Sequence, residues 1–428
     1  MHTPPFHRRI LPWIFAIVFL AMAPSVIFYT AGYRWNPKKG MIERFGTVIV
    51  DSTPSGANID IDGRPLTEKT PYTIQNMAPG LHRFSVSSSG YSRWTKDLDV
   101  YPEQVTFVNG IWLWKTPSPI ERLSVNAASL SGAPDDRTLL ILSASTPTRV
   151  VVFNTITNQS ASSQTGSTIT GPVRVSWSGS TRYALIENGL DSWIVDATNV
   201  QKPAELPRAS DRLSGNDLVG SRDRVQTRIR LRDFSISQET LPASTVDLSD
   251  TAELRSSQNN GGLVFVSKNT PQTGLILPPG HWTFWSEENS HTLLRDGNRW
   301  LSLQEKVTPP EYHIATGDIP RPFTVKRQTR YLLVNDNELW LWDPLTEPEL
   351  LLRQSDRIIG AEWHHDGGDI FAATEKNVFA LNLDSRDGRI VTDLGAFEDI
   401  TSFALSGKSI YVAGTTSSQT GVWELNVE

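Results

Sequence analysis

The chain of 428 residues has no cysteine, only 4 methionines and no excess of basic residues. The absence of cysteine excludes disulfide bonds, thiolate metal sites and cysteine nucleophiles, although it does not indicate a compartment. With 40 Lys and Arg against 46 Asp and Glu, the formal net charge is −6, which argues against a general nucleic-acid-binding protein. The length suggests two or three domains, each able to bury its own core.

Recognisable catalytic motifs are missing as well. The sequence contains no Gly-x-Ser-x-Gly elbow, phosphate-binding loop, zincin motif or dinucleotide fingerprint. Ser, His and Asp all occur, but no spacing among them singles out a triad. We therefore predict no catalytic, cofactor-binding or metal-binding residues, no cofactor and no enzymatic activity.

The first feature that is present is a run of 24 uncharged residues, from Ile10 to Tyr33. As a helix this run would be about 36 Å long, enough to span a hydrocarbon core of about 30 Å. Aromatic residues lie towards its two ends, as is typical of the membrane interface: Trp13, Tyr29, Tyr33 and Trp35. We expect residues 1–45 to form a single-pass membrane anchor and a linker.

A cleaved signal peptide is the alternative, because Ala21–Ala23 resembles a cleavage site. Pro24 would then follow the cut, and the apolar run continues beyond it, so we favour an uncleaved anchor. Arg8 and Arg9 place the N-terminus in the cytoplasm by the positive-inside rule, whereas three basic residues on the other flank argue the opposite: Arg34, Lys38 and Lys39. We predict a cytoplasmic N-terminus, with the C-terminal domains outside the cell membrane.

Residues 46–116 alternate between apolar and polar positions in short segments separated by Pro and Gly, which predicts a compact β-sandwich. Thr47–Ser52, Asn58–Asp62 and Arg83–Ser87 are the clearest strands. The segment contains Gly46-x-Val48-x-Val50-x-Ser52-x-Pro54-x-Gly56-Ala57, followed by Asp62-Gly63, Thr70-Pro71, Pro79-Gly80 and Gly90-Tyr91.

This set of motifs resembles the PEGA domain of bacterial envelope proteins. Ser55 replaces the glutamate of the tetrapeptide that gives the family its name, and Glu68-Lys69 precedes Thr70-Pro71 without the usual glycine. The resemblance implies a small β-sandwich at the cell surface without established catalysis. No site residues carry over, because the motif glycines and prolines are turn formers.

Residues 117–428 repeat one theme, an aromatic or β-branched strand that ends near Asp or Asn. The copies are Val151–Asn154, Trp193–Asp196, Trp340–Asp343, Val378–Asp384 and Val422–Leu425. The spacing is 42 residues from Asn154 to Asp196, 41 from Asp343 to Asp384 and 41 from Asp384 to Leu425, which is typical of a β-propeller blade. Upstream strand–turn–strand units, such as Ser176–Ile186, resemble those of WD40-like propellers.

The repeat is unclear between Asp196 and Trp340, where 70 residues separate Asp233 from Leu303. Asn259–Gly262 and Pro278–Gly280 suggest long loops in this region. We therefore predict a mainly β protein with an N-terminal transmembrane helix, a small PEGA-like β-sandwich and a C-terminal β-propeller of about seven blades, with six or eight possible.

Three groups of side chains could bind a ligand. Trp282 and Trp285 could form a sugar-binding platform, with core packing as the alternative. Arg228, Arg230 and Arg232 would share one face of a strand, as an anion-binding strip or as a solvated blade edge. Vicinal histidines and a carboxylate at His364–Asp366 suggest a metal site, but neighbours in an extended turn point apart, so we expect a solvated turn.

These features predict a membrane-anchored protein of the bacterial cell envelope. Its two β domains would act as a non-catalytic binding or assembly platform for a surface protein or a polysaccharide. One alternative is an enzyme in the propeller channel, a glycan hydrolase or lyase, although the fold by itself carries little functional information. Another is a structural role in a secretion or surface-layer complex. The sequence does not indicate an oligomeric state.

Overall fold

The computed structural model describes residues 6–30, 32–36, 40–169, 173–188, 191–200, 203–206, 212–214, 217–222, 225–233, 235–249, 251–257, 262–268, 274–288, 291–304, 311–325, 328–344 and 346–428. Lys38, Lys39, and Asn259 to Gly261 of the expected loop lie outside these residues, as do the side chains of Arg8 and Arg9. The chain forms two compact units. The first comprises residues 1–116 and 384–390, and the second comprises residues 117–383 and 391–428.

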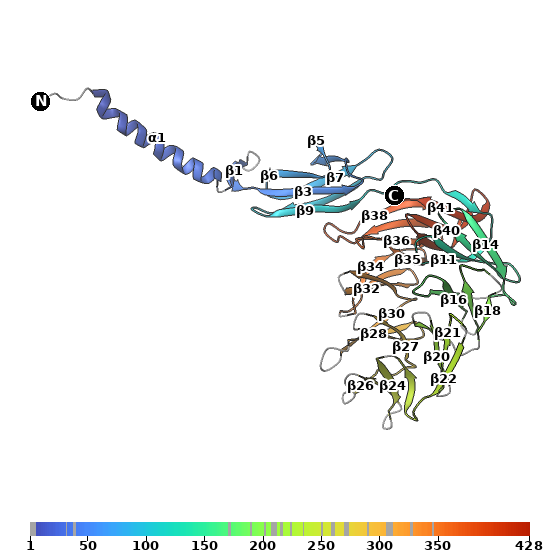
Figure 1. Cartoon of the computed structure of the whole chain (residues 1–428). Helices are drawn as coiled ribbons and strands as arrows, with labels where there is room; N and C mark the ends of the chain where they lie inside the picture. The colour runs from blue at the N-terminus through green and yellow to red at the C-terminus, as the bar shows by residue number, and fades with distance from the viewer. Residues whose placement is uncertain are drawn as a thin grey trace. The chain divides into compact units, whose positions relative to one another are not determined.

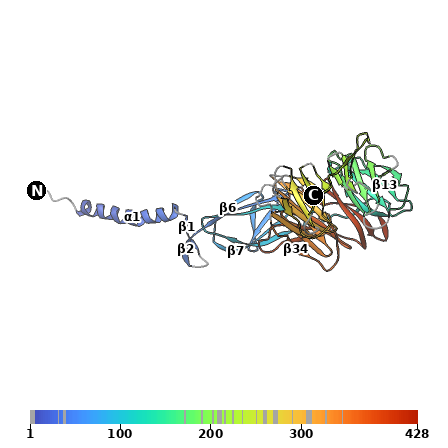
Figure 2. The same cartoon turned by 90° about the horizontal axis from the view of Figure 1, so that it is seen from below.

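Helix α1, Phe6–Thr30, contains most of the apolar run. Its segment Trp13–Thr30 is long and apolar enough to cross a membrane, and none of that segment is buried. A hairpin of β1, Tyr33–Asn36, and β2, Met41–Arg44, follows the helix in the chain (Figure 2). Since a signal sequence can have the same length and composition, α1 is a candidate anchor.

The β module that follows has two sheets. The first has the order β6-β3-β9, and the second has the order β5-β4-β7-β8. Strand β9 runs parallel to β3, and all other neighbours are antiparallel. The strands are β3 Gly46–Thr53, β4 Asn58–Ile61, β5 Arg64–Lys69, β6 Tyr72–Met77, β7 Gly80–Ser87, β8 Trp94–Val100 and β9 Val105–Trp112.

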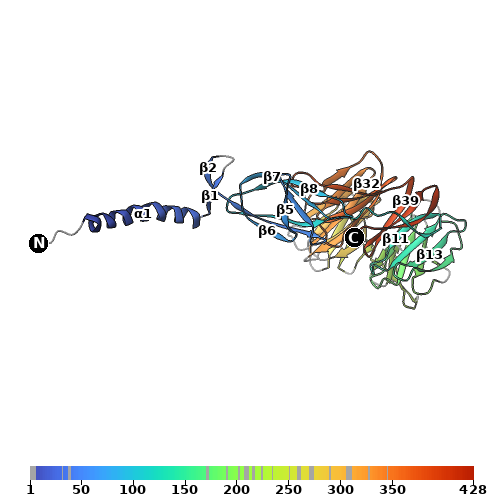
Figure 3. The same ribbon diagram turned by 90° about the horizontal axis from the view of Figure 1, so that it is seen from above.

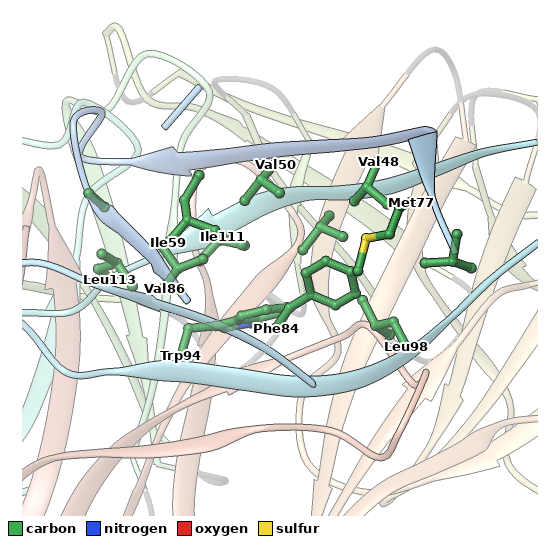
Figure 4. Packing of buried hydrophobic residues seen from close by; sticks show 13 residues of the cluster. Val48, Val50, Ile59, Met77, Phe84, Val86, Trp94, Leu98, Ile111 and Leu113 are labelled. Atoms are coloured by element: carbon green, nitrogen blue, oxygen red, sulfur yellow. The ribbon is translucent and has the colours of Figure 1, made fainter. Parts of the chain in front are cut away.

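The core of this module comes from alternate residues of both sheets. Val48 and Val50 of β3 are buried, while Thr47 and Ile49, which alternate with them, are partly exposed. Figure 4 shows the side chains of Val48, Met77, Phe84 and Leu98 pointing toward one another. This two-faced alternation confirms the expected β-sandwich.

The motif glycines are needed for two different reasons. Gly56, Gly63 and Gly90 have φ between 77° and 82°, which favours glycine in turns. Gly46 instead permits close packing, because a Cβ there would lie 2.5 Å from the carbonyl oxygen of Tyr101.

A buried lysine holds residues 384–390 within the same unit. Lys96 is 1% exposed, and its Nζ donates hydrogen bonds to the carbonyl oxygens of Asp384, Arg386 and Gly388 at 2.5, 2.8 and 2.9 Å. Burial lowers the pKa of Lys96, and the negative charge of Asp384 opposes this shift. Three carbonyl groups thus satisfy all three donors of one buried ammonium group.

The second unit consists of eight four-stranded antiparallel sheets among the described residues. Seven of them are built from four consecutive strands, which is the arrangement of β-propeller blades. They are β11 Ala127–Gly132, β12 Thr138–Ser143, β13 Arg149–Asn154 and β14 Gln159–Gln164; β15 Arg174–Trp177, β16 Tyr183–Glu187, β17 Ser192–Asp196 and β18 Ala204–Glu205; β19 Arg212–Ser214, β20 Asp217–Arg222, β21 Val225–Arg230 and β22 Ser235–Thr240; β23 Thr245–Leu248, β24 Ala252–Ser256, β25 Leu263–Ser267 and β26 Gly274–Ile276; β27 Thr283–Glu288, β28 His291–Asp296, β29 Arg299–Gln304 and β30 Glu311–Thr316; β31 Arg321–Val325, β32 Gln328–Asn335, β33 Glu338–Trp342 and β34 Glu349–Arg353; β35 Ile358–Trp363, β36 Asp369–Thr374, β37 Asn377–Asn382 and β38 Val391–Ala396.

The eighth sheet joins the two ends of the propeller sequence. Its order is β10-β41-β40-β39, so β10, Ile120–Leu123, pairs with the chain's last strands β39 Asp399–Ser406, β40 Ser409–Thr416 and β41 Gln419–Asn426. Figures 1 and 3 show these last strands beside β11, which is in contact with β39 and β40. The ring is therefore closed by pairing of an early strand with late ones.

Charged and polar side chains reinforce this closure. Arg122 of β10 forms an ion pair with Glu424 of β41, and Ser409 donates a hydrogen bond to the same carboxylate at 2.6 Å. Burial raises the pKa of the nearby Tyr411 to about 12; the charge of Glu424 adds to the shift, and that of Arg122 opposes it.

The recurring strand of the sequence is the third strand of its blade in each case, β13, β17, β33, β37 and β41. Two of the aromatic rings that marked the repeat, those of Trp193 and Trp342, are buried between sheets. The sequence predicted about seven blades, with six or eight possible, and the described residues form eight sheets.

We predict that Phe84→Ala destabilises the β module by about 3–5 kcal/mol, because it removes a fully buried ring and leaves a cavity. Hydrogen exchange of the β3, β7 and β8 amides would measure this loss. Leu81→Ala on the same strand is the matched control, since Leu81 is 64% exposed and its loss should change stability by less than about 0.5 kcal/mol. Equal effects of the two variants would contradict the assignment of the core.

We also predict that Lys96→Met loosens residues 384–390, because three carbonyl groups lose their donor. Trypsin should cleave after Arg386 and Arg389 at least about tenfold faster than in the unsubstituted protein, since a hydrogen bond to a charged group contributes about 1.5–3 kcal/mol. Lys69→Met, at an exposed position, should leave the rate unchanged. An unchanged cleavage rate in the Lys96 variant would mean that other contacts hold this segment.

Candidate functional site

A cavity of about 350 Å³ lies where strands of different blades meet in the propeller. The first strands of five blades contribute to its wall: β11, β15, β31, β35 and β39. Because the first strand of a blade is the innermost one, the cavity belongs to the central channel.

The wall combines apolar side chains with small polar and charged ones. Leu130, Leu332, Val334 and Phe403 are apolar members, and the serines are Ser129, Ser131 and Ser402. Three arginines and two carboxylates provide the charge: Arg174, Arg321, Arg357, Asp318 and Glu362. A concave, partly apolar wall with a few charged groups is typical of a ligand-binding site.

The arginines differ in their partners. Arg321 Nε lies 3.4 Å from Glu362 Oε1 and forms an ion pair with it. Within the part of the chain that the structure describes, Arg174 and Arg357 have no side-chain hydrogen bond and no ion pair. Two guanidinium groups at the cavity therefore have donors available for a ligand.

Arg174 occupies a half-buried position on β15, directly opposite Glu187 of β16. Burial lowers the pKa of Arg174, while the negative charges of Glu187 and Asp318 oppose the shift. Burial also lowers the pKa of Arg295 to about 10, and the positive charge of Arg174 adds to this. Arginine side chains stay protonated at neutral pH. The two positive charges therefore repel each other, and water screens this repulsion poorly at half-buried positions.

The predicted platform tryptophans lie elsewhere, around β27. Trp282 is 1% exposed, and its Nε1 donates a hydrogen bond to the carbonyl oxygen of Pro278 at 2.8 Å. Trp285 packs edge-on against Trp300, with 5.3 Å between ring centroids. Sugar binding by Trp282 would require its ring to leave the core, and the ligand-binding role of both residues stays a prediction.

The predicted arginine strip is shorter than expected. Arg228 and Arg230 lie two positions apart on β21 and so share one face of this strand. The strand ends before Arg232, which lies in a turn. The three therefore do not share one face of a strand, because the chain changes direction at Leu231. Arg228 pairs with Asp217 at 3.3 Å, and anion binding by this group also stays a prediction.

The turn at His364–Asp366 differs from the expectation in its burial. His364 is 1% exposed, so the prediction of a solvated turn is wrong for this residue. The two imidazole centroids lie only 4.0 Å apart, because the chain turns tightly here instead of staying extended. Glu428, which the sequence analysis did not consider, lies beside both histidines.

The cavity arginines were also missed from the sequence. A signal for Arg174 was present, because it occupies the innermost strand of a blade, next to the strand–turn–strand unit of Ser176–Ile186. No pattern linked it to Arg357, which lies 183 positions later in the sequence. Only the closed ring brings the two to one cavity.

Comparison with known proteins identifies the small β module. Residues 45–111 match the PEGA domain family, which confirms the resemblance seen in the sequence motifs. None of the curated proteins matches the chain.

Among solved structures, similarity is found to propeller proteins. "Crystal structure of RRP9 WD40 repeats" has 11% sequence identity and a TM-score of 0.45, and the match covers 74% of this chain and 100% of that one. "Structure of U3-55K" has 11% identity and a TM-score of 0.43, with coverages of 71% and 95%. "Crystal Structure of Mitotic Checkpoint Complex" has 12% identity and a TM-score of 0.42, with coverages of 73% and 96%.

Proposed function

We propose that this protein is a membrane-anchored, non-catalytic binding platform of the bacterial cell envelope, whose propeller binds a surface protein or polysaccharide through an anionic group. A PEGA domain and a propeller suggest a binding or scaffold role. The observation that carries the proposal is the cavity with Arg174 and Arg357, whose guanidinium groups have no ion-pair partner among the described residues.

The chemistry of the cavity favours a carboxylate, phosphate or sulfate group. A guanidinium group offers several N–H donors in a plane and matches such oxyanions in pairs of hydrogen bonds. The apolar wall around Arg174 strengthens this attraction, since charges interact more strongly where water is excluded. Asp318 and Glu362 in the same wall would limit binding to groups that fit between them.

The anchor is supported by apolar surface on both α1 and the β1–β2 hairpin. Trp35 and Ile42 are exposed and lie opposite each other in the hairpin, close to the end of the helix. Exposed aromatic and aliphatic side chains next to a spanning segment are typical of the membrane interface. In this proposal the N-terminus lies in the cytoplasm, and both β domains lie outside.

Protease treatment of intact cells tests the orientation. Digestion of the β domains, with a cytoplasmic marker protein left intact, is the expected result. Protection of these domains until the cells are lysed would contradict the outside location.

The binding prediction concerns Arg357→Ala in the full chain in detergent. We expect affinity for an acidic polysaccharide such as alginate, or for an acidic peptide such as polyglutamate, to fall by about 10- to 100-fold, because one charged hydrogen-bonding group is lost. Isothermal titration calorimetry would measure it and would show which of the two ligands binds. Neutral dextran should not bind.

Arg353→Ala is the matched control. Arg353 is an exposed arginine on an outer strand, paired with Glu338, and is not part of the cavity wall. Its substitution should leave the affinity unchanged. Equal losses in both variants would indicate a nonspecific effect of surface charge.

An enzyme in the same cavity is the alternative, favoured by the presence of two carboxylates, Asp318 and Glu362. A glycan hydrolase needs one carboxyl group as proton donor, and Glu362 is instead held in an ion pair by Arg321. Release of new reducing ends or unsaturated products from an acidic glycan, abolished in Glu362→Gln, would replace the binding proposal with the enzyme.

A further inference from the structure

A second group of chemically active side chains lies in the propeller, apart from the residues of the cavity wall. It comprises His364, His365 and Glu428, the His–Glu cluster, whose ligand atoms all lie within 4.8 Å of one another. The histidines occupy the turn between β35 and β36, and Glu428 follows β41 of the closing sheet. Glu428 lies 64 and 63 positions after the two histidines in the sequence, so the packing of two blades brings the cluster together.

Both histidines of the cluster contact the same carboxylate oxygen, Oε1 of Glu428. Glu428 Oε1 lies 3.2 Å from His364 Nε2 and 3.4 Å from His365 Nδ1. His364 is buried, the side chain of Glu428 is nearly buried, and His365 is 60% exposed. Two imidazole nitrogens therefore face one oxygen, with one side of the cluster open to solvent.

The other nitrogen of His364 has a partner of its own. His364 Nδ1 lies 2.7 Å from Asp366 Oδ1, and this oxygen also accepts a hydrogen bond from the Gly368 N–H at 2.8 Å. Since the carboxylate is an acceptor, the ring proton belongs on Nδ1. In a neutral imidazole the lone pair is then on Nε2 and points toward Glu428 Oε1, which is also an acceptor.

Two acceptors that face each other require a positive charge between them. A proton on Nε2 would be donated to Glu428 and would join only His364 and Glu428, whereas a metal ion would bind His364, His365 and Glu428 together. A carboxylate that fixes the tautomer of a histidine, so that its far nitrogen binds metal, is the usual outer partner of a histidine ligand. Asp366 has this position.

We propose that the His–Glu cluster is a binding site for a divalent transition-metal ion, with zinc as the fitting case. Two imidazoles and one carboxylate suit zinc, which takes three such ligands and a fourth from water or a bound molecule. Ligand atoms about 2.0–2.2 Å from a tetrahedral ion lie about 3.3–3.5 Å from one another. The separations of 3.2 and 3.4 Å match this spacing.

Lys408 is the competing positive charge. Its Nζ lies 3.4 Å from the other oxygen of Glu428, Oε2, on a side chain that is 78% exposed. An exposed ammonium group interacts weakly because water screens it. Glu428 can therefore pair with Lys408 through Oε2 and bind a metal ion through Oε1 at the same time.

A bound ion would join the β35–β36 turn to the residues after β41, and so would hold the closing sheet to its neighbour. The exposed side of His365 leaves the fourth coordination position open to solvent. The site therefore suits a stabilising ion that could also accept an external ligand.

The test is titration of Zn²⁺ into the full chain in detergent, purified without a polyhistidine tag. We expect one zinc ion per chain and a higher melting temperature that a chelator reverses. With Co²⁺ as the probe, a visible absorption band typical of tetrahedral cobalt is expected. His365→Ala is the informative variant, since its side chain is exposed and the fold should tolerate its loss.

We expect His365→Ala and Glu428→Gln each to weaken zinc binding at least about tenfold, and Asp366→Asn to weaken it by about 10- to 100-fold through His364. His313→Ala is the matched control, because His313 also faces a carboxylate, that of Glu347 at 3.7 Å, outside the cluster. It should leave zinc affinity unchanged.

Two results would overturn the proposal. One is the absence of stoichiometric zinc binding by the unsubstituted protein, which would favour a protonated His364 between two carboxylates. The other is zinc binding that His365→Ala and Glu428→Gln leave unchanged, which would place the ion on the side of Asp366 and Asp369.

Discussion

The pairing of β10 with β41 is the interaction on which the rest of the propeller depends. Among the sheets that the structure describes in the propeller, the other seven are built from consecutive strands, and only this one takes strands from both ends of the propeller sequence. Without it, the ring would have two open edges with unpaired backbone groups. Burial of the Glu424 carboxylate among Arg122 and Ser409 makes this closure specific, because a buried charge is stable only with its partners present.

Both sites of the propeller follow from this closure. The cavity wall needs β11, β35 and β39 as neighbours, which the closed ring provides. The end of β41 places Glu428 beside the histidines of the preceding blade. The repeated strands themselves have ordinary buried cores, and both proposed binding sites lie outside them, one in the cavity and one in a turn.

The regularity of the repeat decided how well the fold could be predicted. Third strands that contain an aromatic residue and end near Asp or Asn were recognisable from their spacing of 41 or 42 residues. The 70 residues from Asp233 to Leu303 contain the blade β23 to β26 and most of the blade β27 to β30. The third strands of these two blades, β25 and β29, do not end at Asp or Asn. The number of blades therefore could not be predicted from the spacing of the repeat. It follows from the pairing of the strands in the structure, which gives eight sheets in the described residues.

The sequence by itself determined the features that depend on neighbouring residues: the apolar helix, the alternating strands, the turn glycines and the blade repeat. Only the tertiary structure decided which side chains meet. Arg174 and Arg357 line one cavity, Lys96 reaches the carbonyl groups of residues 384–390, and Glu428 faces His364. The physical reason is that these contacts join residues far apart in the chain, and no local pattern records which strands a closed ring places side by side.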